Sequence, residues 1–439
     1  MVPLVKLGTL LSGQSPPTAT VNSDANGTLY VSGPEQWDGH EIHADKWTTE
    51  PKRIAPKSSI FITVKGAGVG KIFPGIEAAI GRDIYAFVPQ PSMSVRYVEH
   101  ALRHSVQEVL RHAVGDIPGL SRKHILDHEI PVPPLKVQEN IVAEIDKQFS
   151  RLDEALANLK RVKANLKRYK AAVLKAAVEG RLVPTESELA RRDGRRYEAG
   201  AEFLQRILEV RRSQLNGSGK CQETVQADVS RLPTLPDGWC WARLNAIAAI
   251  KGGITVDRKR QDPGARLVPY LRVANVQRGY LELADVKKIE ASEAEIEDLR
   301  LMPGDVLFNE GGDRDKLGRG WIWEGQLSEC IHQNHVFRAR PFSRQLSAKF
   351  ISWCGNTLGK EYFLREGKQT TNLASINMTK LAAFPVPIPP AAEQARICNE
   401  AERRLSLLAG LELETERSLE HSLSLRQAVL ARAFGRGSA

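Results

Sequence analysis

Several features that would point to other classes of protein are scarce or absent in this sequence. The chain has only five cysteines (Cys221, Cys240, Cys330, Cys354 and Cys398), and none of them forms a Cys-x-x-Cys pair. An odd, unpatterned set in 439 residues indicates reduced thiols and argues against a disulfide-rich secreted scaffold. No window approaches about 18 uninterrupted apolar residues, so no bilayer-spanning helix is expected.

The first residues, MVPLVKLGTLLSGQSPP, do not have the pattern of a signal peptide. Their apolar run is short and carries one lysine. We expect a first strand or turn here. Together with the reduced cysteines, this predicts a cytoplasmic protein.

Two motifs with a superficial likeness to ligand sites also fall short. KGAGVGKI, from Lys65 to Ile72, has glycines but lacks the GxxxxGK[ST] spacing of a phosphate-binding loop, so a tight turn between strands is the better interpretation. The histidine pairs lack nearby carboxylate or cysteine ligands that would complete a tetrahedral zinc site, so no metal is expected. These pairs are His100/His104, His124/His128 and His332/His335.

What the chain does have is a globular composition and an excess of positive charge. Hydrophobic residues make up 42% and charged residues 26%, and the net charge is +10. The length predicts more than one domain. The charge favours a polyanionic partner such as DNA, RNA or an anionic membrane surface.

The most informative feature is an internal repeat. EIPVPPLKVQENI, from Glu129, returns as FPVPIPPAAEQARI, from Phe384. An offset of 256 places Pro131 on Pro387 and Gln138 on Gln394, and the match continues for roughly 50 residues without a gap. In each copy the prolines hold the chain extended and delay the start of a helix.

A long helix is predicted after each proline-rich phrase. In the first copy, apolar residues such as Ile145, Leu152 and Leu166 recur at spacings of three and four, with two lysines intruding. A helix over 137–179 would be about 60 Å long, so its apolar stripe needs another long helix as partner. The second copy continues such a stripe, with Thr415 and Ser422 as weak positions. Two antiparallel helices in a coiled coil are therefore expected; two separate local hairpins are the alternative.

The rest of the chain divides into two strand-rich segments and a bridge. Residues 1–130 and 231–386 contain short runs rich in Val, Ile, Phe and Tyr, which predict strands. Residues 131–180 and 387–439 contain the long helices. Residues 181–230 form a polar helical bridge and linker. The predicted fold class is α+β, with two pseudo-repeated strand-rich domains separated by the two long antiparallel helices.

These residues resemble the DNA specificity subunit of type I restriction–modification systems. The resemblance rests on the doubled Pro-Pro…Gln…Ile phrase, the helix ends AAVLKAAVEGRL and QAVLARAFGRG, the LPDGW phrase and YLRVANVQRGYL (Tyr270–Leu281). Two departures stand out: Val137 replaces the acidic residue that Glu393 supplies in the second copy, and the first half begins without an LPxGW phrase.

The resemblance implies a function without catalysis. Each strand-rich segment would be a target recognition domain that reads half of a split, asymmetric DNA sequence, and the coiled coil would set the gap. Two methyltransferase subunits, and through them endonuclease subunits, would dock on the chain and carry S-adenosylmethionine, ATP and Mg²⁺. In agreement, the Asn/Asp-Pro-Pro-Tyr/Phe motif of amino-methyltransferases is missing. The alternatives are a self-contained enzyme, a coiled-coil scaffold, or a DNA-binding protein outside restriction–modification.

Candidate DNA-contacting residues are basic and amide side chains on glycine-flanked loops, because such groups can reach base edges and phosphates. In the second segment they lie in NEGGDRDKLGRGW, in REGKQTTN and along YLRVANVQRGYL. In the first segment they surround the glycine turn and precede the proline-rich phrase. The full set is Lys65, Lys71, Arg82, Arg122, Arg272, Asn275, Arg278, Arg314, Lys316, Arg319, Lys368, Gln369, Thr370 and Asn372.

Overall fold

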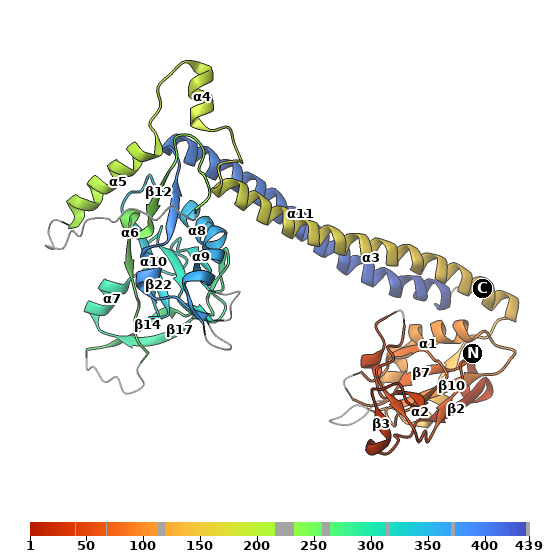
Figure 1. Ribbon diagram of the computed structural model, residues 1–439. Helices are drawn as coiled ribbons and strands as arrows, with labels where there is room; N and C mark the ends of the chain where they lie inside the picture. Colours follow the sequence, from red (N-terminus) through yellow and green to blue (C-terminus); the bar gives the residue numbers. More distant parts are fainter. Residues whose placement is uncertain are drawn as a thin grey trace. The chain divides into compact units, whose positions relative to one another are not determined.

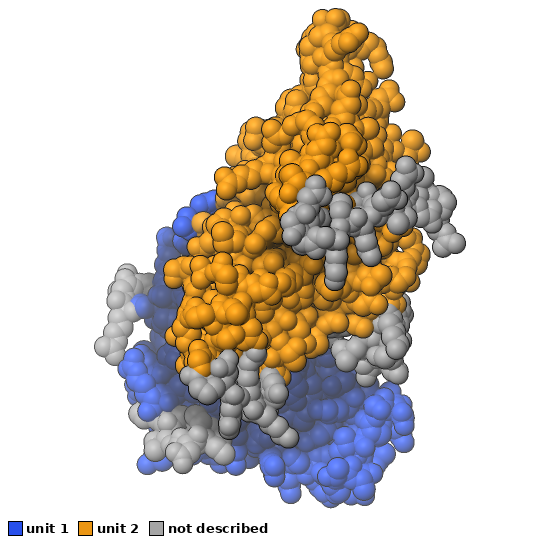
Figure 2. Space-filling view, turned by 90° about the vertical axis from the view of Figure 1, so that its left-hand side faces the viewer, with its two compact units in different colours: residues 1–162, 414–439 blue, residues 163–413 orange. Residues whose placement is uncertain are grey.

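The computed structural model describes residues 1–39, 41–66, 68–111, 119–215, 232–256, 264–312, 317–369 and 374–435 (Figure 1). The chain forms two compact units, coloured separately in Figure 2. Unit 1 consists of residues 1–162 and 414–439, and unit 2 of residues 163–413. Both units mix helices with short strands, which confirms the predicted α+β class. None of the helices in the described residues combines the length and apolarity that crossing a membrane requires.

Unit 1 is organised around a four-stranded antiparallel sheet. Its strands, in spatial order, are β2 (Gly8–Ser12), β10 (Ile84–Pro89), β7 (Ile60–Thr63) and β8 (Ile72–Pro74). Helix α1 (Val95–Leu110) packs on this sheet through Tyr97, Val98, Ala101 and Leu102, which are buried with Ile60, Ile62 and Phe87. Two of the short apolar runs that predict strands, SIFITVKG from Ser59 and DIYAFVP from Asp83, thus form the centre of the unit.

Smaller elements complete unit 1. Strand β1 (Val2–Pro3) pairs with β11 (Glu129–Ile130), so the N-terminal segment meets the proline-rich phrase. A second sheet has the order β3 (Val21–Asn22), β5 (Trp47–Thr48), β4 (Thr28–Val31), β9 (Ala78–Ile80) and β6 (Ile54–Ala55). The short helices are η1 (Leu4–Lys6), η2 (Thr18–Thr20), η3 (Pro34–Gln36) and α2 (Arg122–Leu126).

Unit 2 repeats this arrangement. Its central antiparallel sheet contains β13 (Ala248–Lys251), β22 (Val336–Pro341), β18 (Val306–Asn309) and β20 (Gly320–Ile322), in that order. Strand β12 (Cys240–Arg243) pairs with β25 (Pro385–Ile388) as β1 pairs with β11. Each unit also contains a parallel strand pair, β4 with β9 in unit 1 and β14 (Arg266–Leu271) with β21 (Ile331–His332) in unit 2. The internal repeat therefore extends from the proline-rich phrases to the topology of the sheets.

The other elements of unit 2 surround this sheet. The strands are β15 (Val276–Gln277), β16 (Tyr280–Leu281), β17 (Lys287–Ala291), β19 (Gly311–Gly312), β23 (Lys368–Gln369) and β24 (Ala374–Ser375). The helices are α6 (Leu244–Ile247), α7 (Glu293–Leu299), α8 (Ala348–Asn356), α9 (Leu358–Glu366) and α10 (Met378–Ala382). Helices α8 and α9 are separated at Thr357, whose φ and ψ of −109° and −78° interrupt the helix.

The two predicted long helices are present. Helix α3 (Leu135–Val178) and helix α11 (Ala391–Phe434) have 44 residues each and begin directly after the proline-rich phrases. Both helices contribute to both units: residues 135–162 and 414–434 belong to unit 1, and residues 163–178 and 391–413 to unit 2.

Within each unit the two long helices pack antiparallel. In unit 1, Arg426 of α11 forms an ion pair with Asp153 and lies 5.3 Å from the ring centroid of Phe149. In unit 2, Val173 and Ala177 of α3 share a core with Ile397 and Ala401 of α11. Positions early in α3 therefore meet positions late in α11, and the reverse. Thr415 and Ser422, the weak positions of the apolar stripe, are 6% and 8% exposed. Both are therefore buried, like the apolar residues of the stripe.

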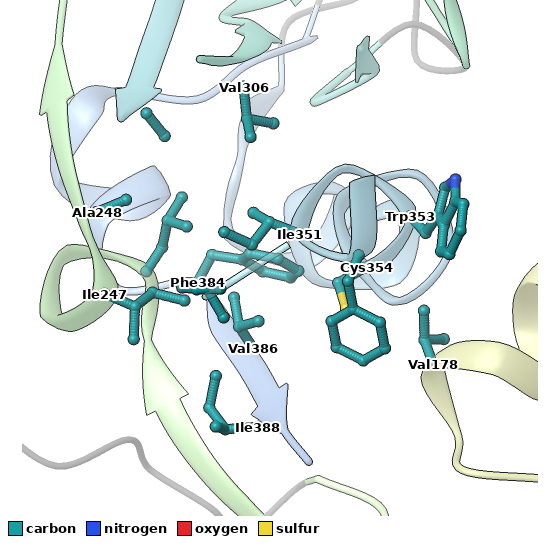
Figure 3. Close-up of a cluster of buried hydrophobic side chains, with 14 of the residues drawn as sticks. Val178, Ile247, Ala248, Val306, Ile351, Trp353, Cys354, Phe384, Val386 and Ile388 are labelled. Atoms are coloured by element: carbon teal, nitrogen blue, oxygen red, sulfur yellow. The ribbon is translucent and has the colours of Figure 1, made fainter. Parts of the chain in front are cut away.

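The bridge is polar in composition, but part of it packs into the hydrophobic core of unit 2. It contains α4 (Glu186–Asp193) and α5 (Gly200–Leu215), while the linker at 216–231 lies outside the described residues. Phe203 and Ile207 of α5 are 0% and 1% exposed. They join the large core of unit 2, part of which is drawn in Figure 3 around Phe384, Ile351 and Cys354.

Candidate nucleic-acid interface

One edge of the central sheet of unit 1 gathers the predicted basic residues of the first segment. Strand β7 ends beside the starts of β8 and β10, because Ile62 is paired with Ile72 and Thr63 with Ile84. Lys65 follows β7, Lys71 precedes β8 and Arg82 precedes β10, so antiparallel pairing brings them to the same edge. All three side chains are exposed, and within the described residues none makes an ion pair.

The turn between β7 and β8 is closed by its own backbone. The Gly70 N–H donates to the Thr63 carbonyl (2.8 Å) and the Lys71 N–H to that of Gly68 (3.1 Å). Gly66 and Gly70 have φ of 79° and 83°, a conformation that side chains disfavour. These bonds confirm the predicted tight turn, because the two amides are already used inside the turn.

Arg122 approaches the same edge from helix α2. Its guanidinium Nη1 donates to the Leu10 carbonyl and to Ser12 Oγ, both at 2.8 Å, at the end of β2. Lys65 is joined to the residues just before α2 by a β-bridge with Gly119. We call Lys65, Lys71, Arg82 and Arg122 the basic edge of unit 1. Three of its cations face solvent, and the fourth is held against the sheet.

The corresponding edge of unit 2 carries the richest predicted loop. Asn309, the last residue of β18, is paired with Val336, and Phe308 with Gly320, so β18 ends where β20 and β22 begin. The loop between β18 and β20 therefore corresponds to the glycine turn of unit 1, because β18 and β20 take the places of β7 and β8 in the sheet. Arg319 lies directly before β20, and its Nη2 is 3.4 Å from the Val273 carbonyl. Arg314 and Lys316 lie outside the described residues.

The second predicted loop of unit 2, residues 365–372, shares a small sheet with the first loop. Strands β19, β24 and β23 form a three-stranded sheet in that order, with Gly312 and Gln369 both paired with Ala374. The backbones of Lys368 and Gln369 thus lie in the same small sheet as β19, which belongs to the first loop, with β24 between the two strands. Thr370 and Asn372 fall outside the described residues. The structure brings together the roots of two loops that are about 55 positions apart in the chain.

The strand–turn phrase Tyr270–Leu281 contains one misassigned residue. Asn275 is 2% exposed, its Oδ1 accepts the Arg272 N–H, and its Nδ2 donates to the carbonyls of Glu282 and Asp285. No side-chain donor remains for a base, so the predicted DNA contact by Asn275 is wrong and its role is to close the turn. Arg272 pairs with Asp285 at 2.9 Å. Arg278 is exposed and donates to the Asn356 carbonyl at 2.6 Å.

The aromatic tip of this phrase is not among the predicted residues. Tyr280 is 55% exposed in the hairpin formed by β15 and β16. The Gly279 N–H donates to the Gly320 carbonyl (3.2 Å), which fixes the hairpin next to the start of β20. An exposed tyrosine beside Arg278 and Arg319 can stack on or contact a nucleotide. Its signal in the sequence was the Arg-Gly-Tyr turn itself.

The repeated proline-rich phrase has a specific structural task. Gln138 Oε1 accepts the backbone N–H of Ser94, and Gln394 Oε1 accepts that of Ser347, at 3.0 and 2.7 Å. Ser94 and Ser347 are the N-cap residues of α1 and α8. The same glutamine therefore joins the first turn of a long helix to the helix that covers the sheet, once in each unit.

Glu393, the residue before Gln394, has partners that exist only in unit 2. Its carboxylate accepts the Trp239 indole N–H (2.8 Å) and the Glu186 backbone N–H (2.7 Å). Burial raises the pKa of Glu393, and the two hydrogen bonds oppose that rise. Trp239 belongs to the LPDGW phrase, which the first half lacks. The two departures noted in the sequence are Val137 and the missing LPxGW phrase. Together they remove from unit 1 both partners of the contact that Glu393 and Trp239 make in unit 2.

The buried histidines are held as neutral groups. His100 Nε2 lies 3.2 Å from Asp146 Oδ1, and His332 Nδ1 lies 2.6 Å from the Val336 carbonyl oxygen. Both side chains are 0% exposed, and burial lowers the pKa of each to about 4. Each ring therefore has a hydrogen-bonding role in the core.

Comparison with known proteins agrees with this architecture. Residues 4–168 match the model of the type I restriction modification DNA specificity domain. The putative type I restriction enzyme MjaX specificity subunit of Methanocaldococcus jannaschii is 24% identical over 166 residues, which cover 37% of this chain and 38% of that protein. The EcoKI specificity subunit of Escherichia coli K12 is 25% identical over 168 residues, covering 38% and 36%. The matched region thus spans less than two thirds of these relatives.

Solved structures share the fold over the whole length. A chain from a structure of the type I R-M system has a TM-score of 0.67 at 15% identity and covers 100% of this chain and 97% of its own. The HsdS subunit from Thermoanaerobacter tengcongensis has a TM-score of 0.56 at 16% identity, with 100% and 96% covered. The chain is therefore similar to type I restriction–modification DNA specificity subunits in the sequence of residues 4–168 and in its fold over the whole length.

Proposed function

We propose that this chain recognises a split, asymmetric DNA sequence and confers that specificity on a type I restriction–modification complex. Unit 1 would read one half of the target and unit 2 the other. The observation that carries the proposal is that the same edge of the same sheet, built twice, presents the candidate DNA-contacting loops.

The chemistry of these edges suits DNA. Lys65, Lys71 and Arg82 are exposed cations that can neutralise phosphates, and this releases counterions and favours binding. The loops rooted at β18, β19 and β23 contribute further basic and amide side chains, the groups that read base edges in the major groove. Arg272 and Arg122, which are tied to neighbouring groups, would position loops or contact the backbone.

The long helices would fix the distance between half-sites. A helix of 44 residues is about 66 Å long at 1.5 Å per residue, which corresponds to about 19 base pairs of B-DNA at 3.4 Å each. The gap between half-sites would be shorter, because each recognition unit occupies several base pairs itself.

Catalysis would belong to partner subunits. We propose that two methyltransferase subunits dock on this chain and that endonuclease subunits join through them, with S-adenosylmethionine, ATP and Mg²⁺ on those partners. Two observations support a chain without catalytic groups. The amino-methyltransferase motif is missing, and the buried histidines His100 and His332 are already hydrogen-bonded in the core.

The decisive experiment is to co-express the chain with its methyltransferase subunit and to map N6-methyladenine in the host DNA. Methylation in one split motif that disappears when this chain is deleted supports the proposal. Replacing residues 1–130 by the same segment of a relative should change one half of that motif only. If the complex assembles but methylation is absent or unsplit, the scaffold hypothesis is favoured instead.

A further inference from the structure

Unit 1 contains a large open groove at the start of α3. Its volume is about 1150 Å³, and its walls come from α1, Pro131–Pro133, the first turns of α3 and the end of α11. The lining is mainly apolar and includes Tyr97, Ile141 and Phe434. Val137, also in the lining, is 43% exposed. The volume exceeds the roughly 300–1,000 Å³ of small-molecule pockets, so a segment of polypeptide is the better match.

The equivalent place in unit 2 is occupied by this chain itself. Phe203 and Ile207 of α5 are packed in one core with Ile388, Ile397 and Ala401. The start of α5 runs so close to β25 that a Cβ on Gly200 would lie 2.2 Å from the Ile388 carbonyl oxygen.

The repeat shows that the two places correspond. At the offset of 256, Val137 aligns with Glu393, and Val178 aligns with Phe434. Phe434 packs against Tyr97 in unit 1 with ring centroids 5.2 Å apart, and Val178 is buried in the core of unit 2. The groove of unit 1 therefore corresponds to the site that α5 fills in unit 2. Within the described residues, no helix equivalent to α5 fills it.

The residues that line the groove determine the chemistry of a segment that can bind in it. In unit 2 Glu393 needs donors and receives them from Trp239 and Glu186, whereas Val137 can accept no hydrogen bond. The occupant of unit 1 must therefore present an apolar surface at that point. The exposed charged side chains of the lining are Glu108, Glu129 and Glu144 against Arg432, so the rim favours a basic segment.

We propose that this groove binds a basic amphipathic helix of a partner protein, with an aromatic and an aliphatic side chain four residues apart. Helix α5 has this chemistry, because Phe203 and Ile207 share a face and Arg206, Arg211 and Arg212 flank it. A second copy of the chain cannot supply α5, since Phe203 and Ile207 are buried in its own unit 2. The inference goes beyond DNA recognition and does not depend on it.

The test uses the full chain and a labelled peptide with the sequence of residues 199–215 as probe, followed by fluorescence anisotropy. We expect saturable binding. A peptide with Phe203→Ala and Ile207→Ala should bind at least about tenfold more weakly, because the buried apolar surface is lost. In the protein, Val137→Lys should weaken binding by a similar factor, since it places a charge in the apolar lining.

Val162→Lys provides the matched control. Val162 is on the same helix with the same 43% exposure but does not line the groove, so this variant should bind like the parent chain. Three results would overturn the proposal: absence of saturable binding, equal affinity of the Val137→Lys and parent chains, or self-association of the parent that Val137→Lys abolishes. The last would make a second copy the occupant. No DNA is used, so failure here leaves the proposed function untouched.

Discussion

The basic edge of unit 1 gives a prediction with a defined magnitude. Lys65, Lys71 and Arg82 are exposed, lie at one edge of one sheet and make no ion pair within the described residues. If each contacts a phosphate, their joint replacement by alanine removes up to three counterion-releasing contacts. The slope of log K against log salt concentration for B-DNA is about −0.9 per phosphate, so it should become less negative by up to about 2.7.

The assay is fluorescence anisotropy of the assembled methyltransferase complex with a duplex that carries its methylated motif, between about 50 and 200 mM salt. Because phosphate contacts carry no sequence information, binding should weaken on specific and non-specific duplexes alike. The control is Lys57→Ala: Lys57 is also exposed but precedes β7, at the opposite end of the strand. An unchanged slope in the triple variant, or an equal change in the control, would refute the placement of DNA on this edge.

Three further predictions concern stability. Gln394→Ala leaves the Ser347 N–H without its acceptor and should lower the free energy of unfolding by about 1–3 kcal/mol in urea titrations. His100 and His332 have pKa values lowered to about 4, so the folded chain keeps them neutral while the unfolded chain protonates them below about pH 6.5. Stability should therefore be lost as the pH falls from about 6.5 towards 4, by about 1.4 kcal/mol per pH unit for each histidine. Ser422→Ala should raise Tm slightly, because in the described part of the chain the hydroxyl bonds only its own helix, at the Ser418 carbonyl (2.7 Å), and alanine favours helix by about 0.5 kcal/mol.

Each of these has a direct check. Gln427→Ala, at an exposed position of the same helix as Gln394, should change stability by less than about 0.5 kcal/mol. The double variant His100→Gln/His332→Gln should show a flatter pH profile than the parent, and an identical profile would contradict the assignment of neutral histidines. A clear destabilisation by Ser422→Ala would mean that its hydroxyl has another partner.

The asymmetry between the two units bears on how the chain is assembled. In unit 2 the bridge, the LPDGW phrase and the start of α11 are joined through Glu393, Trp239 and Glu186. In unit 1 the equivalent position is Val137, beside an open groove. Two units with the same central sheet thus differ at their junction with the long helices, and this difference would distinguish them for a partner that docks there.

The sequence by itself determined the repeat, the two long helices and most of the central strands. Local sequence patterns specify these features. Prolines fix where a helix can begin, and a spacing of three and four places apolar residues in one stripe over many turns. Short runs of β-branched residues favour strands. The predicted helix over 137–179 and the observed α3 at Leu135–Val178 differ by only two residues at its start.

The tertiary structure alone decided which side chains meet. Lys71 and Arg82 come to one edge because β8 and β10 both pair with β7, and no local pattern records that pairing. Asn275 reads as a surface residue in a turn, yet the closing of its hairpin buries it at 2% exposure. The contact of Trp239 with Glu393 joins positions 154 apart in the chain. Periodicity specifies the face of an element, whereas register and long-range packing select the neighbours of that face, and those neighbours make the site.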